Sequence, residues 1–282
     1  MRLEDQSAVV RDAVSPELAD AILLVTALGG TTVPMALLGT LFWLASAHRR
    51  RVALAIGYAI AGLPLLLAVK AILALPRPPE EALLVPLEVE GYGFPSGHAF
   101  AAVVVYGGLV VAFDRIRDWR ALAAVAVVVG LVSLSRVALG VHYLGDVVVG
   151  IALGIVVLAS VVRLTRADPT RIFLLALVVS IPAVALTGGS DDALLGLGGA
   201  IGGLLAGRSV DQLPALRSPL EGVVLVGVAG SVTVAIRALE SVVGSARPGL
   251  VALYAVLVAW IFLAPAVVAR GLDAVPERWL AG

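Results

Sequence analysis

Long apolar runs separated by short polar segments are the feature of this sequence that most restricts its fold. A helix needs roughly 20 apolar residues to cross a bilayer core of about 30 Å. Hydrophobic residues make up 60% of the chain and charged residues 14%, whereas a soluble domain averages about 45–50% and about 25%. We therefore predict an all-α, polytopic integral membrane helical bundle of about nine spans. The runs lie at residues 21–47, 52–75, 98–113, 120–138, 142–162, 172–188, 192–206, 221–239 and 249–269.

Two of these runs depart from a plain span. The first contains Gly29-Gly30 and Pro34, which favour a short interfacial helix followed by a minimal span. The run at 192–206 is short enough to be re-entrant. The polar opening, residues 1–20, lacks the basic start and cleavage site of a secretory signal peptide, so we expect the first run to be retained.

Composition excludes several classes of function. Basic and acidic residues both number 20, which leaves no net charge to attract a polyanion, so no nucleic-acid partner is expected. Because the sequence has no cysteine, a disulfide framework, a thiolate nucleophile and a Cys-ligated metal are excluded. Membrane lipids remain as the expected partners, and the oligomeric state stays open.

The arginines predict an orientation. If the runs alternate across the bilayer, most arginines fall on one side, and short basic loops stay in the cytoplasm. We therefore expect a multi-pass cell-membrane protein with its N-terminus outside and its C-terminus inside. The cytoplasmic set comprises Arg49, Arg50, Arg51, Arg115, Arg117, Arg120, Arg163, Arg166, Arg171, Arg208, Arg217, Arg270 and Arg278.

Composition also divides the chain into two predicted parts, 1–167 and 168–282. The first part holds the single lysine and all three histidines, whereas the second has apolar runs rich in Gly, Ala, Val and Leu without either residue type. The pairs Gly198/Gly202 and Gly199/Gly203 have the spacing of closely packed helices. An oligomer interface, a lid and a transport module are all open as roles for the second part.

Three elements of the first part carry candidate chemistry. Lys70 interrupts an apolar run, and an ionisable residue inside a span is by default a functional candidate, with snorkelling to the interface as the alternative. Arg77 follows on the same side. Ser96-Gly97-His98 begins a new run, where helix N–H groups favour a phosphate. The plain alternative there is a capped helix with a solvated histidine.

The third element contains Arg136, His142 and Asp146. Gly140 is expected to close the fourth span and His142 to open the fifth, so that His142 and Asp146, four residues apart, share a helix face. An Asp that accepts a hydrogen bond from one imidazole nitrogen leaves the lone pair of the other free to attack. A purely structural His–Asp pair at the membrane interface is the alternative.

Alternating spans place all three elements on the extracellular side. Three cations there suit a phosphate dianion and the charge that spreads over its oxygens in the transition state. Two histidines can divide the work of nucleophile and general acid. Nothing in the set has the spacing of a metal-ligand cluster, so no cofactor or metal is expected.

These residues resemble the three-part motif of the type 2 phosphatidic acid phosphatase superfamily, which includes membrane lipid phosphatases and soluble vanadium-dependent haloperoxidases. Every motif position is present at the expected spacing, and the resemblance covers about residues 17–165. The matching segments are Lys70 with Arg77-Pro78, Pro95-Ser96-Gly97-His98, and Ser135-Arg136 with His142 and Asp146.

The resemblance implies a role for each residue. His142 would form a phosphohistidine, Asp146 would orient it, and His98 would protonate the leaving group and later activate water. The phosphoryl oxygens would be held without a divalent metal by Lys70, Arg77, Ser96, Gly97 and Arg136.

The expected function is hydrolysis of a lipid phosphate or diphosphate in the bilayer. Phosphatidic acid-like lipids, phosphatidylglycerophosphate and polyprenyl diphosphate all fit this description. Two alternatives stay open at this point. The same intermediate could pass its phosphoryl group to an alcohol, which would make the protein a lipid phosphotransferase. Alternatively, the cationic pocket could bind head groups without chemistry, as in a phospholipid transporter or flippase.

Overall fold

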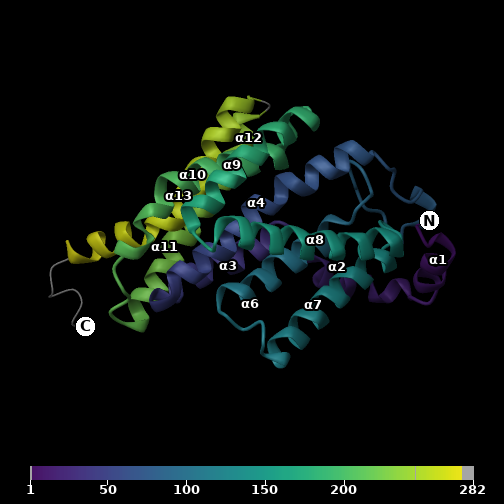
Figure 1. Ribbon diagram of the computed structural model, residues 1–282, viewed down its shortest axis with the longest axis horizontal. Coiled ribbons are helices and arrows are strands. Elements are labelled where there is room, and N and C mark those ends of the chain that lie inside the picture. Colours follow the sequence, from purple (N-terminus) through teal and green to yellow (C-terminus); the bar gives the residue numbers. More distant parts are fainter. Residues whose placement is uncertain (1, 245, 275–282) are drawn as a thin grey trace.

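A computed structural model describes residues 2–244 and 246–274, and this part of the chain is helical without any strand (Figure 1). The predicted all-α bundle is thereby confirmed. Arg278, part of the cytoplasmic arginine set, lies outside the described residues. The helices are α1 Glu4–Asp12, α2 Ala19–Ala27, α3 Thr32–Leu44, α4 Arg49–Leu73, α5 Gly97–Ala102, α6 Gly108–Ala112, α7 Trp119–Ala138, α8 Leu144–Thr165, α9 Pro169–Leu186, α10 Asp191–Ala206, α11 Pro219–Ala238, α12 Glu240–Val243 and α13 Arg247–Asp273.

Seven helical segments of the described chain are long and apolar enough to cross a membrane. The bent pair α2–α3 makes an eighth if it is counted as one span, and a shorter apolar segment runs from Gly97 to Ala112. Each of the nine predicted runs therefore falls on a helical segment. The seven are Ser46–Leu73, Trp119–Ala138, Leu144–Thr165, Pro169–Leu186, Asp191–Gln212, Pro219–Val243 and Arg247–Asp273.

The two unusual runs have distinct outcomes. The first run is broken between α2 and α3, where Gly29-Gly30 separates two helices bent by 46°. The run predicted at 192–206 extends in the structure over Asp191–Gln212, because a 3₁₀ turn continues α10. This length allows it to cross the membrane rather than re-enter.

Local sequence signals explain where several helices begin. Asp118 caps α7 by accepting a hydrogen bond from the Arg120 N–H at 3.0 Å. Asp168 caps α9 in the same way, with 2.9 Å to the Arg171 N–H, and Pro169 follows at the first helical position. A π-helical turn, Val103–Gly107, joins α5 to α6 within one segment.

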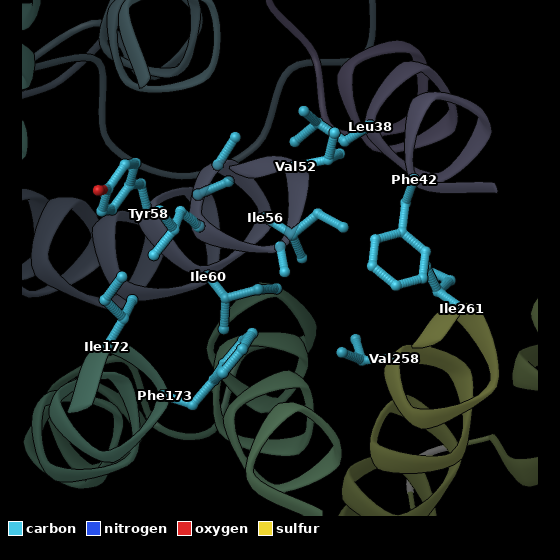
Figure 2. Packing of buried hydrophobic residues seen from close by; sticks show 14 of the residues in the cluster. Leu38, Phe42, Val52, Ile56, Tyr58, Ile60, Ile172, Phe173, Val258 and Ile261 are labelled. Carbon is cyan, nitrogen blue, oxygen red and sulfur yellow. The ribbon is translucent and has the colours of Figure 1, made fainter. Parts of the chain in front are cut away.

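The central helix α4 packs against both predicted parts of the chain. Figure 2 shows its side chains meeting those of α3, α9 and α13 in one hydrophobic cluster. Helix α10 packs on α4, α9 and α13. The two parts therefore share a core, whose buried members include Phe42, Val52, Ile56, Tyr58, Ile60, Ile172, Phe173, Val258 and Phe262.

Arginines at the start of α4 contact both parts of the chain at one end of the bundle. Arg50 pairs with Asp211 at 2.7 Å, and Arg51 pairs with Asp114 at 3.3 Å. Arg49, which is buried, donates to the Phe42 carbonyl at 3.2 Å. Because α4 runs from this end to Lys70, the candidate site lies at the opposite end of the bundle.

Candidate active site

The structure brings the predicted site residues together at the far end of α4. One pocket is lined by Lys70, Arg77, Gly97, His98, Arg136 and His142, and we call this the head pocket. Ser96 and Asp146 lie directly behind it, with the Ser96 N–H donating to the Asp146 carbonyl at 2.9 Å. This backbone bond joins the start of α5 to the start of α8. The roles of these residues remain predictions.

His142 and Asp146 form a buried pair. The exposed fraction of the His142 side chain is 2%, and its Nδ1 lies 3.4 Å from Asp146 Oδ2. The other ring nitrogen, Nε2, lies 3.4 Å from Arg77 Nη1 at the pocket wall. This arrangement matches an imidazole held through one nitrogen by a carboxylate while the other faces a bound group.

One structural expectation for this pair is wrong. His142 does not open the fifth span, because α8 begins at Leu144 and His142 lies in the turn after α7. Gly140 has φ +73°, and Tyr143 is an extended N-cap, so the chain cannot continue as a helix through this turn. The carboxylate of Asp146 instead accepts the Tyr143 N–H at 3.0 Å, which brings it beside His142 from the first turn of α8.

Arg2 is a site residue that the sequence analysis did not identify. Its guanidinium makes two hydrogen bonds to the Asp146 carboxylate, each 2.8 Å long. It also lies 4.7 Å from the Tyr143 ring and donates to the Pro76 carbonyl at 2.7 Å. Arg2 therefore fixes the carboxylate that contacts His142. The only sequence signal was the position of Arg2 on the predicted extracellular side.

The three cations of the head pocket are held by different elements. Lys70 Nζ donates to the Tyr92 carbonyl at 2.8 Å, and Arg77 Nη2 donates to the Glu90 carbonyl at 2.8 Å. Arg136 is buried and donates from Nη1 to Thr26 Oγ1 at 3.0 Å. The loop between α4 and α5 thus orients two of the cations through its backbone carbonyls.

The start of α5 presents small, closely packed groups to the pocket. Ser96 is the N-cap, and Gly97 and His98 form the first turn, as the sequence predicted. A Cβ on Gly97 would lie 3.7 Å from Lys70 Cε, and one on Gly29 would lie 2.9 Å from the His98 carbonyl oxygen. The break between α2 and α3 therefore allows the chain to pass directly beside His98.

Burial sets the ionisation of His142. Removal from water disfavours the imidazolium and lowers the pKa of His142 to about 4. The hydrogen bond to Asp146 acts in the opposite direction, and the charges of Arg136, Arg77 and Lys70 add to the lowering. At neutral pH the ring is therefore uncharged and keeps a lone pair on one nitrogen.

Known proteins were compared with this chain by structure and by sequence. Two solved structures are similar: a transmembrane PAP2-type phosphatidylglycerolphosphate phosphatase from Bacillus subtilis and LpxE from Aquifex aeolicus. The first is 26% identical, with TM-score 0.46, over 55% of this chain and 79% of that one. The second is 22% identical, with TM-score 0.45, over 55% and 92%.

The curated proteins contain no match to this chain. The sequence model of the PAP2 superfamily matches residues 35–169. This range includes every residue of the head pocket together with Ser96 and Asp146, and it ends at the start of α9. Residues 35–169 of this multi-pass membrane protein therefore belong to the PAP2 superfamily.

Proposed function

We propose that the protein hydrolyses a lipid phosphate or diphosphate through a phosphohistidine on His142, at the extracellular face of the cell membrane. The observation that carries the proposal is the position of His142. Its Nδ1 lies 3.4 Å from Asp146 and its Nε2 lies 3.4 Å from Arg77, in a pocket with two further cations. An uncharged, oriented imidazole beside a phosphate-sized cluster of cations fits nucleophilic attack on phosphorus.

In the first step, His142 Nε2 attacks phosphorus and the bond from phosphorus to the lipid oxygen breaks. The bound phosphate dianion favours protonation of His98, which lines the same pocket, and His98 gives this proton to the departing oxygen. Lys70, Arg77 and Arg136 balance the charge on the equatorial phosphoryl oxygens. Asp146 stabilises the positive charge that develops on His142.

In the second step, neutral His98 takes a proton from water as the water oxygen attacks phosphorus. The bond between phosphorus and His142 Nε2 breaks, inorganic phosphate leaves, and both histidines return to their starting forms. No step needs a metal ion, so we expect turnover to persist in a chelator.

Two orphaned polar atoms support phosphate as the bound group. Ser96 Oγ and Arg136 Nε are buried, and neither has a hydrogen-bond partner in the described chain. Buried donors without partners are costly, and phosphoryl oxygens would satisfy both. Each belongs to a motif segment that contributes to the pocket.

The test is release of phosphate from defined lipid phosphates by purified protein in detergent with EDTA. His142→Ala is expected to lower turnover by about 10⁴-fold or more, because the nucleophile is lost. His48→Ala is the matched control, since His48 stacks on Phe113 elsewhere in the fold and should leave turnover unchanged. Wild-type turnover in the His142→Ala variant would exclude the phosphohistidine.

Two further measurements separate the alternatives. Wild-type protein given ³²P-labelled substrate and quenched in alkali should retain label, whereas His142→Ala should not. Addition of an acceptor lipid tests phosphoryl transfer, because a transferase would form a phosphorylated acceptor in place of free phosphate. Binding of substrate without either product would identify a transporter.

A further inference from the structure

The head pocket continues into an apolar cavity, and together they have a volume of about 560 Å³. The charged groups lie at one end. The rest of the lining is mostly apolar, with the hydroxyl groups of Thr31, Thr187 and Ser190 among it, and it comes from helices that are distant in sequence. We call this part the tail cavity, and its lining includes Ile60, Leu63, Val105, Leu257, Val258 and Ile261.

The tail cavity extends along α4, a helix long enough to cross a membrane. Its lining follows α4 from Lys70 down to Ala59, which is about 16 Å at about 1.5 Å per residue. That distance is about half of a bilayer core of about 30 Å. The cavity therefore has the depth of one lipid leaflet, with the cations at its outer end.

Helices from the second part of the chain close one side of this cavity. Ile60 of α4 projects into the same space as Val258 and Ile261 of α13 (Figure 2). Leu195 of α10 and Leu186 of α9 also line it. All of these except Ile60 lie beyond residue 169, where the PAP2 match ends.

The wall formed by α13 is held firmly against the rest of the bundle. The Trp43 indole donates to the Ile261 carbonyl at 2.9 Å, and the rings of Phe42 and Phe262 pack edge to face at 5.0 Å. A Cβ on Gly202 would lie 2.2 Å from the Ala255 carbonyl oxygen, so α10 and α13 approach closely. The position of α13 beside the cavity is therefore fixed by specific contacts.

We propose that the tail cavity binds one hydrocarbon chain of the lipid phosphate whose head group is cleaved, an inference that rests on the proposed function. A methylene group is close in size to a water molecule, which occupies about 30 Å³ in the liquid. The volume of about 560 Å³ and the depth of about 16 Å are of the size needed for a phosphate and one chain of about 14 carbon atoms. The substrate class is a phosphate ester with one chain enclosed between the core and α13.

The test compares butyl phosphate with dodecyl phosphate in the same detergent. Leu257→Trp fills the cavity from α13 and should lower kcat/KM for dodecyl phosphate about tenfold while changing that for butyl phosphate less than twofold. Val256→Trp is the matched control, because Val256 is 55% exposed on the same helix. Since micelle partitioning is common to all variants, only the ratio between the two substrates is compared.

A second measurement does not depend on the folding of a variant. A dodecyl phosphonate with a diazirine at the chain end is photolysed with the wild-type protein. Label in the α13 peptide, competed by dodecyl phosphate, is expected. Equal kcat/KM ratios in Leu257→Trp and wild type, or labelling that misses α13, would overturn the tail cavity. If wild-type protein cleaves neither ester, the proposed function fails, and the crosslink still reports whether the cavity binds a chain.

Discussion

The head pocket and the C-terminal helices α9–α13 differ in how they use the chain. In and directly behind the head pocket, nearly every charged side chain is fixed by a hydrogen bond, as in the pairs Arg136–Thr26 and Arg2–Asp146. Helices α10 and α13 contribute aliphatic walls and glycine contacts instead. Under the two proposals above, one region determines the reaction, whereas the other determines which molecule reaches it. Variants should therefore separate chemical rate from chain selectivity.

Among the variants that separate the two regions, the largest effect is expected at His98, whose proposed role is in the chemical step. His98→Asn should lower kcat by about 10² to 10⁴-fold, the usual contribution of a general acid. The loss should shrink when the leaving group is an aryl oxide, because that group departs without a proton. The measurement is kcat for an alkyl and an aryl phosphate with both proteins.

One outcome of this experiment would contradict the proposed role of His98. An equal loss with both leaving groups would mean that His98 acts on binding or packing and not as an acid. The ratio of dodecyl to butyl phosphate turnover should stay unchanged, because His98 is placed at the head end of the cavity.

The next effect is expected at Arg2, a positioning residue that acts through Asp146. Arg2→Gln removes two 2.8 Å hydrogen bonds from a fully buried carboxylate, which should cost about 3 kcal/mol of stability. We expect kcat to fall about 10–100-fold with little change in KM, because the phosphate-binding cations stay in place. Kinetics and thermal unfolding in detergent measure the two effects.

Two control variants test whether the charge of Arg2 and its position matter. Arg2→Lys should recover part of kcat, since a lysine keeps the charge but cannot make the two parallel bonds. Arg11→Gln should have little effect, because Arg11 pairs with the exposed Asp12. An Arg2→Gln variant that loses stability but keeps kcat would reduce Arg2 to a structural role.

The sequence predicted the helical segments and the motif residues because both depend on local patterns. Apolar runs indicate spans, and the spacing from Lys70 to Asp146 needs no knowledge of packing. The contact between Arg2 and Asp146 spans 144 positions, and no periodicity reports it. The turn at His142 was missed because a four-residue spacing fits both a helix and a capped turn. The sequence did not predict that α13 lines the cavity, because an aliphatic side chain carries no signal of which other helix it contacts.

A smaller effect is expected from the glycine contacts between α10 and α13. Gly202→Val places atoms against the backbone of α13, where even a Cβ would lie 2.2 Å from the Ala255 carbonyl oxygen. Overpacking of this kind usually costs about 1–3 kcal/mol. We expect lower thermal stability and a changed ratio of dodecyl to butyl phosphate turnover, with butyl phosphate still cleaved.

The control for this change is Gly227→Val on α11, where a Cβ would meet nothing within 4 Å. It should leave both the unfolding temperature and the substrate ratio near the wild-type values. If Gly202→Val abolishes turnover of both esters while the protein stays folded, the separation between the two regions is wrong.

The smallest expected effect is the change in kcat/KM when the pH is lowered from 7 to 5. Because the pKa of His142 is lowered to about 4, about 90% of its rings are neutral at pH 5, against about 3% for an ordinary histidine near 6.5. Loss of kcat/KM through His142 should therefore stay below about twofold between pH 7 and pH 5, and become tenfold per unit only below about pH 4. If the fall in kcat/KM comes from the second ionisation of the substrate, its midpoint will change when the ester is changed. If it comes from His142, its midpoint will stay the same. An ester-independent loss of kcat/KM centred near pH 6.5 would mean that His142 is exposed to water, and it would contradict a buried nucleophile.

The lowered pKa of His142 also affects folding. The unfolded chain binds a proton at His142 more readily than the folded one, so the free energy of unfolding should fall as the pH decreases from about 6.5 to 4.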